Sequence, residues 1–153
     1  MGRMYTAIFD AVAVTAAQDL FEIVAPSDAV VRLHRIIINQ SSDTDSEQLR
    51  FAIKRGATTS GSGGSSVTPN PASAGDSAFG GTVEANNTTR ASAGTIVTLH
   101  VEAQNVLNGW DWHPTPEERI DISPSIRLIV GLEAAPVDSL TMHGTMYFEE
   151  IGG

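Results

Sequence analysis

Three histidines lie in three separate segments that we expect to form strands, and imidazole is a common ligand of zinc and other transition metals. They are His34, His100 and His143. No two of them have the short spacing of a ligand pair, and scattered histidines of this kind are more often ordinary surface or core residues. We therefore expect no metal and no other cofactor, and a metal-dependent sandwich that uses these histidines is kept only as a third hypothesis.

Two further patterns match known functional motifs only in part. Asp43, Asp45 and Glu47 alternate like oxygen ligands for Ca²⁺, but the glycine and the terminal glutamate of a calcium-binding loop are missing, so a solvated hairpin is favoured. Residues 61–64 (GSGG) lack the Lys-Ser/Thr of a phosphate-binding loop, and the chain has no Gly-x-Ser-x-Gly nucleophile motif. We assign no catalytic residue and expect a protein that is not an enzyme.

The sharpest local signature is the segment 105–119, NVLNGWDWHPTPEER, which holds both tryptophans of the chain. Trp110 and Trp112 are two positions apart, so in a strand they point to the same side. They either cover the core or, beside rigid prolines, anchor a docking surface. The candidate interface residues are Trp110, Trp112, His113, Pro114 and Pro116, with Met4 and Tyr5 from the N-terminal stretch Met1 to Phe9.

Apolar residues recur at every second position in four runs, which is the pattern of half-buried strands. The runs, with the residues expected to face inward, are Gln48–Arg55 (Leu49, Phe51, Ile53), Thr95–Glu102 (Val97, Leu99, Val101), Ile126–Leu132 (Ile126, Leu128, Val130, Leu132) and Leu140–Phe148 (Leu140, Met142, Met146, Phe148).

Five shorter runs are also rich in β-forming residues: Met4–Phe9, Leu20–Val24, Val30–Asn39, Thr82–Ala85 and Arg119–Ile122. Among them, Val30–Asn39 is expected to be the most buried. The stretch Ala11–Gln18 fits a helix or a strand. Short strands separated by Pro, Gly, Asn and Asp turns predict an all-β fold, namely a jelly-roll-like β-sandwich.

Residues 56–94 form a Gly/Ser/Thr-rich tract with few charges, and we expect one long loop there. Its apolar residues Val67, Phe79 and Val83 favour a loop that is ordered against its own domain or a neighbouring subunit over a mobile one. The expected organisation is a single domain over residues 1–153, with residues 1–10 as a possible N-terminal arm.

Composition limits the classes of partner. Eighteen acidic and nine basic residues give a net charge of −9, and Lys54 is the sole lysine, which argues against a nucleic-acid partner. The chain has no cysteine, no run of 18 apolar residues and no apolar N-terminal signal. We expect no membrane partner and a protein made in the cytoplasm of its host.

Four segments resemble small virion proteins of tailed phages and prophages, of the kind that decorate or cement capsids, and the similarity spans about Val30 to Glu150. The segments are Asp43–Leu49 (DTDSEQL), Arg55–Gly64 (RGATTSGSGG), Glu84–Thr89 (EANNTT) and Pro114–Arg119 (PTPEER). The resemblance brings no catalytic residues with it. It implies a virion structural role, and its nearest functional class is the β-sandwich proteins that trimerise on the outside of phage heads.

The leading hypothesis is therefore a structural protein on the outer surface of a bacteriophage head, a homotrimer that decorates or cements the shell by binding the major capsid protein. The alternative is a carbohydrate- or host-receptor-binding module of a phage fibre or tail, in which Trp110 and Trp112 stack on sugar rings. The third is the metal-dependent, cupin-like sandwich that uses the histidines.

Overall fold

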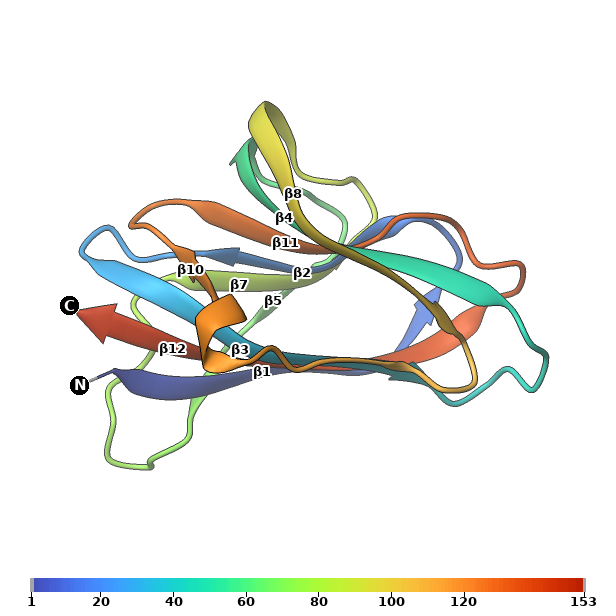
Figure 1. The fold of residues 1–153 in the computed structure, drawn as a ribbon, viewed down its shortest axis with the longest axis horizontal. Helices are drawn as coiled ribbons and strands as arrows, with labels where there is room; N and C mark the ends of the chain where they lie inside the picture. The colour runs from blue at the N-terminus through green and yellow to red at the C-terminus, as the bar shows by residue number, and fades with distance from the viewer. Residues whose placement is uncertain (1, 153) are drawn as a thin grey trace.

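The computed structural model describes residues 2–152, which fold as two antiparallel β-sheets packed face to face (Figure 1). Sheet A has the strand order β10-β3-β12-β1-β6, with β9 also paired to β3, and sheet B has the order β5-β7-β2-β11-β4-β8. The predicted all-β sandwich is confirmed. Its jelly-roll-like connectivity stays a prediction.

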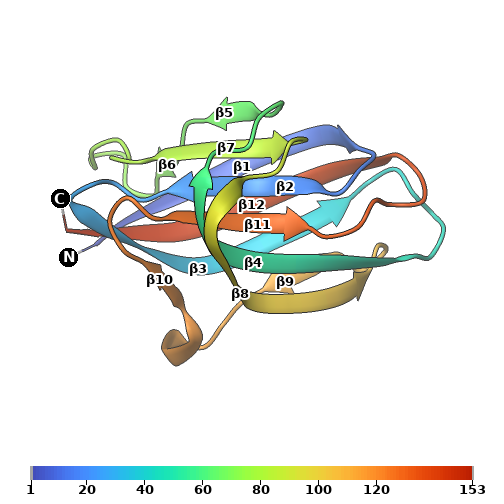
Figure 2. The same cartoon turned by 90° about the horizontal axis from the view of Figure 1, so that it is seen from above.

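Most strands are short and are joined by turns, as Figure 2 shows from above. The elements are β1 (Arg3–Val14), β2 (Gln18–Val24), β3 (Ala29–Gln40), β4 (Gln48–Thr59), β5 (Ser65–Val67), β6 (Asn70–Pro71), β7 (Thr82–Asn87), β8 (Ser92–Asn105), β9 (Trp110–Trp112), the 3-10 turn η1 (Pro116–Glu118), β10 (Ile120–Ile122), β11 (Arg127–Leu132) and β12 (Leu140–Gly152). In the part of the chain that the structure describes, no helix is long and apolar enough to cross a membrane.

The core lies between the sheets and is built by strands that alternate inward and outward side chains. In β4 the predicted inward residues Leu49, Phe51 and Ile53 are all buried. In β12 every second residue from Leu140 to Phe148 is buried as well. These two strands confirm the period-two prediction, because each has one face on the core and one face outside it.

The central strands of sheet B are buried on both faces. In β2 all residues from Gln18 to Ile23 are buried, and in β11 all residues from Leu128 to Leu132 are buried. The expectation that Val30–Asn39 is the most buried segment is therefore wrong. That segment lies in β3, where buried and partly exposed residues largely alternate.

The N-terminal residues belong to the sandwich and do not form an arm. From Arg3 onward they make β1, which pairs with β12 on one side and with β6 on the other. Tyr5, Ala7 and Phe9 alternate into the core, and that burial is the reason the arm prediction for residues 1–10 is wrong. Met1 lies outside the described residues. The helical alternative for 11–18 is also wrong, because β1 continues through a bulge, with a positive φ of 52° at Ala11.

The tract 56–94 is mostly paired strand and turn, so the prediction of one long loop is wrong. It contains the end of β4, all of β5, β6 and β7, and the start of β8. Small residues let its backbones approach closely: a Cβ at Gly64 would lie 2.2 Å from the carbonyl oxygen of Ala85. The tract is ordered against its own domain, since Val83 is buried and the ring of Phe79 packs edge-on against Phe148 at 4.9 Å.

Candidate functional site

Both tryptophans are part of the core. Trp110 and Trp112 point to the same side of β9, as predicted, and are 1% and 7% exposed. The ring of Trp110 stacks on Phe51 with centroids 4.9 Å apart, and its indole nitrogen donates a hydrogen bond to Glu102 over 3.1 Å. Of the two alternatives left by the sequence, the structure supports the core role, because both side chains are almost fully buried.

The other candidate interface residues divide into two groups. Tyr5 is fully buried, its hydroxyl donates to the carbonyl oxygen of Ser77 over 2.8 Å, and burial raises the pKa of that hydroxyl. Met4 is partly buried. His113 and Pro116 are exposed and Pro114 is half-buried, so the segment that leads from β9 into η1 does lie at the surface.

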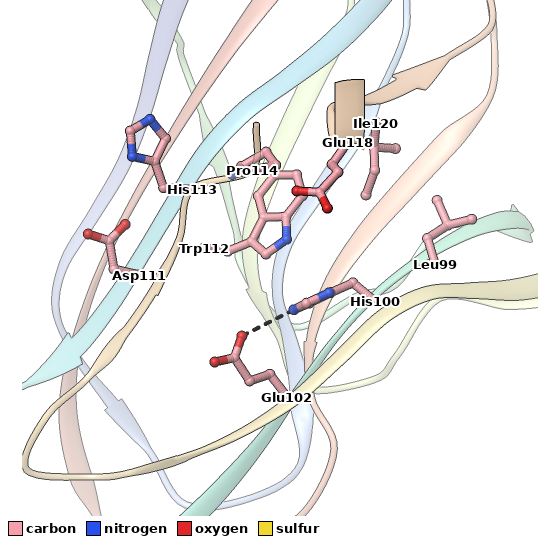
Figure 3. A pocket seen from close by; sticks show the side chains of 9 residues that line it. All are labelled: Leu99, His100, Glu102, Asp111, Trp112, His113, Pro114, Glu118 and Ile120. Atoms are coloured by element: carbon pink, nitrogen blue, oxygen red, sulfur yellow. Dashed lines mark hydrogen bonds and ion pairs between the residues drawn. The ribbon is translucent and has the colours of Figure 1, made fainter. Parts of the chain in front are cut away.

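An open cleft of about 430 Å³ lies beside this segment, between β8, β9 and η1 (Figure 3). Trp112, His100 and Leu99 line it together with Glu118 of η1 and Ile120 of β10. The imidazole of His100 lies 6.0 Å from the ring of Trp112 and 6.3 Å from that of Trp110. The indole of Trp112 therefore forms part of the wall of a surface cleft that also carries imidazole and acidic groups.

Glu102 links the cleft to the core through hydrogen bonds. Its carboxylate lies 3.2 Å from His100 Nε2 and accepts from the indole of Trp110 and the amide of Gln104. Burial alone would raise the pKa of Glu102, but these hydrogen bonds outweigh it and hold the pKa below its ordinary value. Glu102 is therefore a fixed negative charge at neutral pH that orients His100.

The three histidines do not converge. His34 lies against Glu149 at 3.1 Å, His143 against Asp10 at 2.5 Å, and His100 against Glu102. Within residues 2–152 no cluster of three or more His, Asp or Glu side chains is placed to hold a metal ion. The arrangement therefore gives no support to the metal-dependent hypothesis or to calcium at residues 43–47.

Large apolar side chains are exposed along β8, where the sequence predicted inward-facing ones. Val97, Leu99 and Val101 are 40%, 37% and 55% exposed, and their neighbour Ile96 is 42% exposed. The prediction of their burial is wrong, because β8 is the last strand of sheet B and pairs only with β4. We call Ile96, Val97, Leu99 and Val101 the β8 strip.

Backbone geometry explains why the β8 strip stands clear of the core. The ladder between β4 and β8 has register shifts after Ile53 and after Arg55, and such bulges bend and twist a strand pair. Gly56 has a φ of +94°, and a Cβ there would lie 2.2 Å from the carbonyl oxygen of Thr95. The paired ends of β4 and β8 consequently rise out of the sandwich, as Figure 1 shows.

A network of buried charges covers the outer face of sheet B, and sequence reasoning missed it. Glu22 of β2 accepts hydrogen bonds from Arg127 (2.5 Å), the Ser60 hydroxyl (2.5 Å), the Gly61 amide (2.9 Å) and Asn87 (3.1 Å). Its side chain is 2% exposed. The segment that follows β4 and the end of β7 are thus held over β2. The polar residues Gln18, Asp19 and Glu22 of β2 were the available signal, but they look the same as those of a solvated face.

The second half of this network holds the base of the projecting pair of strands, β4 and β8. Arg90 bridges Asp19 (3.0 Å) and Glu133 (2.5 Å), and Lys54 of β4 lies 2.6 Å from Glu133. Burial raises the pKa of Asp19, although the Ala91 amide and Arg90 act to lower it. Burial would also raise the pKa of Glu133, but its two cationic partners outweigh burial and lower that pKa.

No family model matches the sequence, and no curated protein matches it. Among solved structures the chain is similar to one described as "Structure of infectious bursal disease virus Gx strain", with a TM-score of 0.23 and 13% sequence identity. The match covers 99% of this chain and 42% of that chain, so this chain spans less than half the length of its counterpart.

Proposed function

We propose that the chain is a non-enzymatic virion structural protein that decorates the outer surface of a tailed-phage capsid. The observation that carries the proposal is the β8 strip, where four large apolar side chains are exposed on one edge strand. Contiguous exposed apolar surface on a folded domain marks a protein interaction site. The phage setting comes from the resemblance of segments such as 43–49 and 114–119 to phage virion proteins.

In this proposal the protein acts as a homo-oligomer, a trimer, whose copies bridge neighbouring subunits of the major capsid protein. Many modest contacts on one shell give high avidity and oppose the outward pressure of packaged DNA. The chain carries a net charge of −9 and the side chains of the β8 strip are uncharged, so we expect apolar contacts to contribute more to capsid binding than ionic contacts do. Moderate salt should therefore weaken binding only slightly, because screening acts mainly on exposed charges.

The test compares capsids with and without the protein. A protein that binds the assembled shell stabilises that shell by linkage. Particles that lack the protein should still assemble but should release DNA at a lower temperature, and purified protein added back should restore the release temperature. Equal heat resistance of depleted and complete particles would refute the proposal, above all if the depleted particles also failed to adsorb to cells.

The cleft at His100 favours one second candidate, the binding of a host carbohydrate by a fibre or tail module. Sugar-binding sites combine an aromatic wall with polar groups, and here Trp112 lies beside His100 and Glu118 (Figure 3). A glycan array tests it directly: binding by the intact protein that is lost in His100→Ala and kept in His34→Ala would support this candidate over decoration. His34 lies on β3 and is not among the residues that line the cleft.

A further inference from the structure

A serine, a histidine and an aspartate form a chain of hydrogen bonds on the outer face of sheet A. The hydroxyl of Ser41 lies 2.8 Å from Nε2 of His143, and Nδ1 of His143 lies 2.5 Å from a carboxylate oxygen of Asp10. A hydroxyl joined to an imidazole that a third group orients is the arrangement of an activated nucleophile.

Three neighbouring strands of sheet A bring these residues together. β12 carries His143 and pairs with β1 on one side and with β3 on the other. Asp10 lies in the bulge of β1, and Ser41 directly follows β3. The Ser41 amide donates to the carbonyl oxygen of Thr141 over 3.0 Å, two residues before His143. Backbone pairing therefore sets the distance between the hydroxyl and the imidazole.

The imidazole has its proton on the side of Asp10. The contact between Nδ1 and the Asp10 carboxylate is 2.5 Å long, whereas the Ala11 amide lies 3.2 Å from the same nitrogen. An ionised carboxylate accepts hydrogen bonds and donates none, so Nδ1 carries the proton and Nε2 keeps a free lone pair. Nε2 can therefore accept the Ser41 proton as that hydroxyl attacks, and Asp10 stabilises the imidazolium that forms.

Two backbone amides next to Ser41 converge on one oxygen atom. The N–H groups of Ser42 and Asp43 both donate to the side-chain oxygen of Gln40, over 2.7 Å each. In many serine hydrolases the N–H of the residue after the nucleophile stabilises the negative oxygen that forms during acyl transfer. Here Gln40 occupies both donors, so a carbonyl oxygen reaches them only when that side chain moves away.

We propose that Ser41 is an activated nucleophile that takes an acyl group from an activated carboxylic ester. The Ser41 oxygen bonds to the carbonyl carbon, its proton passes to Nε2 of His143 and then to the departing alcohol, and the bond to that alcohol breaks. Asp10 is 79% exposed and Gln40 fills the donor pair, so we expect one slow acylation per chain and no rapid turnover. This reactivity goes beyond the proposed function and does not depend on it, since a protein that is modified once remains non-enzymatic.

Reaction of the intact chain with para-nitrophenyl acetate tests the proposal. Nitrophenolate should be released until each chain carries an acetyl group, and peptide mapping by mass spectrometry after an acid quench should place that group on Ser41. Background from amines is low, because Lys54 is the sole lysine of the chain. Ser41→Ala should lose the acetylated peptide, and His143→Ala should slow its formation by about 100-fold.

Two further variants sharpen the test. His34→Ala is the control, since His34 also contacts a carboxylate, that of Glu149 at 3.1 Å, and its loss should leave the acylation rate unchanged. Gln40→Ala frees the two backbone amides and should raise the rate, because they can then stabilise the negative oxygen. Circular dichroism checks that each variant folds, and His143→Gln replaces His143→Ala if the latter does not.

The proposal would be overturned by an intact chain that releases nitrophenolate no faster than Ser41→Ala does. Acetyl groups spread equally over many serines, or equal acylation rates for the intact chain and His143→Ala, would overturn it as well. A lower rate in Gln40→Ala would refute the role given to the two amides. None of these results affects the capsid test, which follows the DNA-release temperature.

Discussion

β2 and β8 lie in the same sheet and reverse the usual relation between polarity and burial. β2 buries two carboxylates, Asp19 and Glu22, on its outer face, whereas β8 exposes Val97 and Val101. The difference lies in what covers each strand. Segments of the same chain fold over β2 and supply hydrogen bonds to its carboxylates, and nothing in the described chain covers the β8 strip.

This contrast separates a surface that the chain closes for itself from one that it leaves open. A buried carboxylate is tolerated only when donors surround it, and Glu22 has four such donors. An exposed apolar strand gains most from another chain, because its side chains are still in water.

The largest effect is expected at Glu22. Glu22→Ala leaves the Arg127 guanidinium, which is 15% exposed, without its carboxylate partner and opens the cover over β2. Loss of one partner of a buried ion pair costs about 3–5 kcal/mol of unfolding free energy. Urea unfolding measures the change, with the exposed Glu117→Ala as the control, which should stay within about 0.5 kcal/mol. Equal stabilities of the two variants would show that the network adds nothing.

A smaller effect with two opposite signs is expected from pH. The pKa of Glu133 is lowered in the folded state, so its stabilising contribution is present above the ordinary value of 4.5 and is lost as pH falls through the folded pKa. The pKa of Asp19 is raised, so its contribution is present below 3.8 and is lost as pH rises through the folded pKa. Each of these two groups changes the slope of the unfolding free energy against pH by at most about 1.4 kcal/mol per pH unit.

Two amide variants measure these slopes. In acid, Glu133→Gln should lose less stability than the intact protein as pH falls, because the carboxylate that titrates is gone. The Asp19 carboxyl lowers the unfolding free energy of the intact protein as pH rises above 3.8, and Asp19→Asn removes this loss. The unfolding free energy of Asp19→Asn should therefore rise more steeply above pH 3.8 than that of the intact protein. Unfolding curves at successive pH values provide the comparison. Parallel curves for all three proteins would contradict the assigned directions.

The smallest effect on the fold is expected in the β8 strip. Val101 is 55% exposed, so Val101→Ser should change the unfolding free energy of the isolated chain by no more than about 0.5 kcal/mol. The same change should weaken binding to capsids, which co-sedimentation with depleted particles can measure. A large loss of stability at a concentration where the chain is monomeric would mean that β8 belongs to the core after all.

The sequence predicted the sandwich well where one face of a strand meets the core. Leu49, Phe51 and Ile53 alternate inward as expected, and every short segment proposed as a strand is one. An alternating pattern does not show which strand lies at the edge of a sheet, however. The same pattern in β8 therefore predicted burial for side chains that are exposed. The tract 56–94 was misjudged because its glycines permit close backbone pairing as readily as they permit a loop.

The site was predicted only in part. The segment at Trp110 does lie beside a surface cleft, but the indoles themselves are buried because the Trp110 ring stacks on Phe51 and its nitrogen bonds to Glu102. That contact joins β9 to β4 and β8 across the two sheets, and no local pattern encodes it. The β8 strip was missed for the same reason, since its exposure depends on which strand lies at the edge of sheet B.

The pairing of β1 with β12 sets the time at which sheet A can form. Arg3 lies opposite Glu150, so β1 has its main partner only after the last strand has been made. At usual rates of translation β1 waits on the order of ten seconds for that strand. Every strand of sheet B precedes β12 in the chain, so sheet B can form while β1 still lacks its main partner.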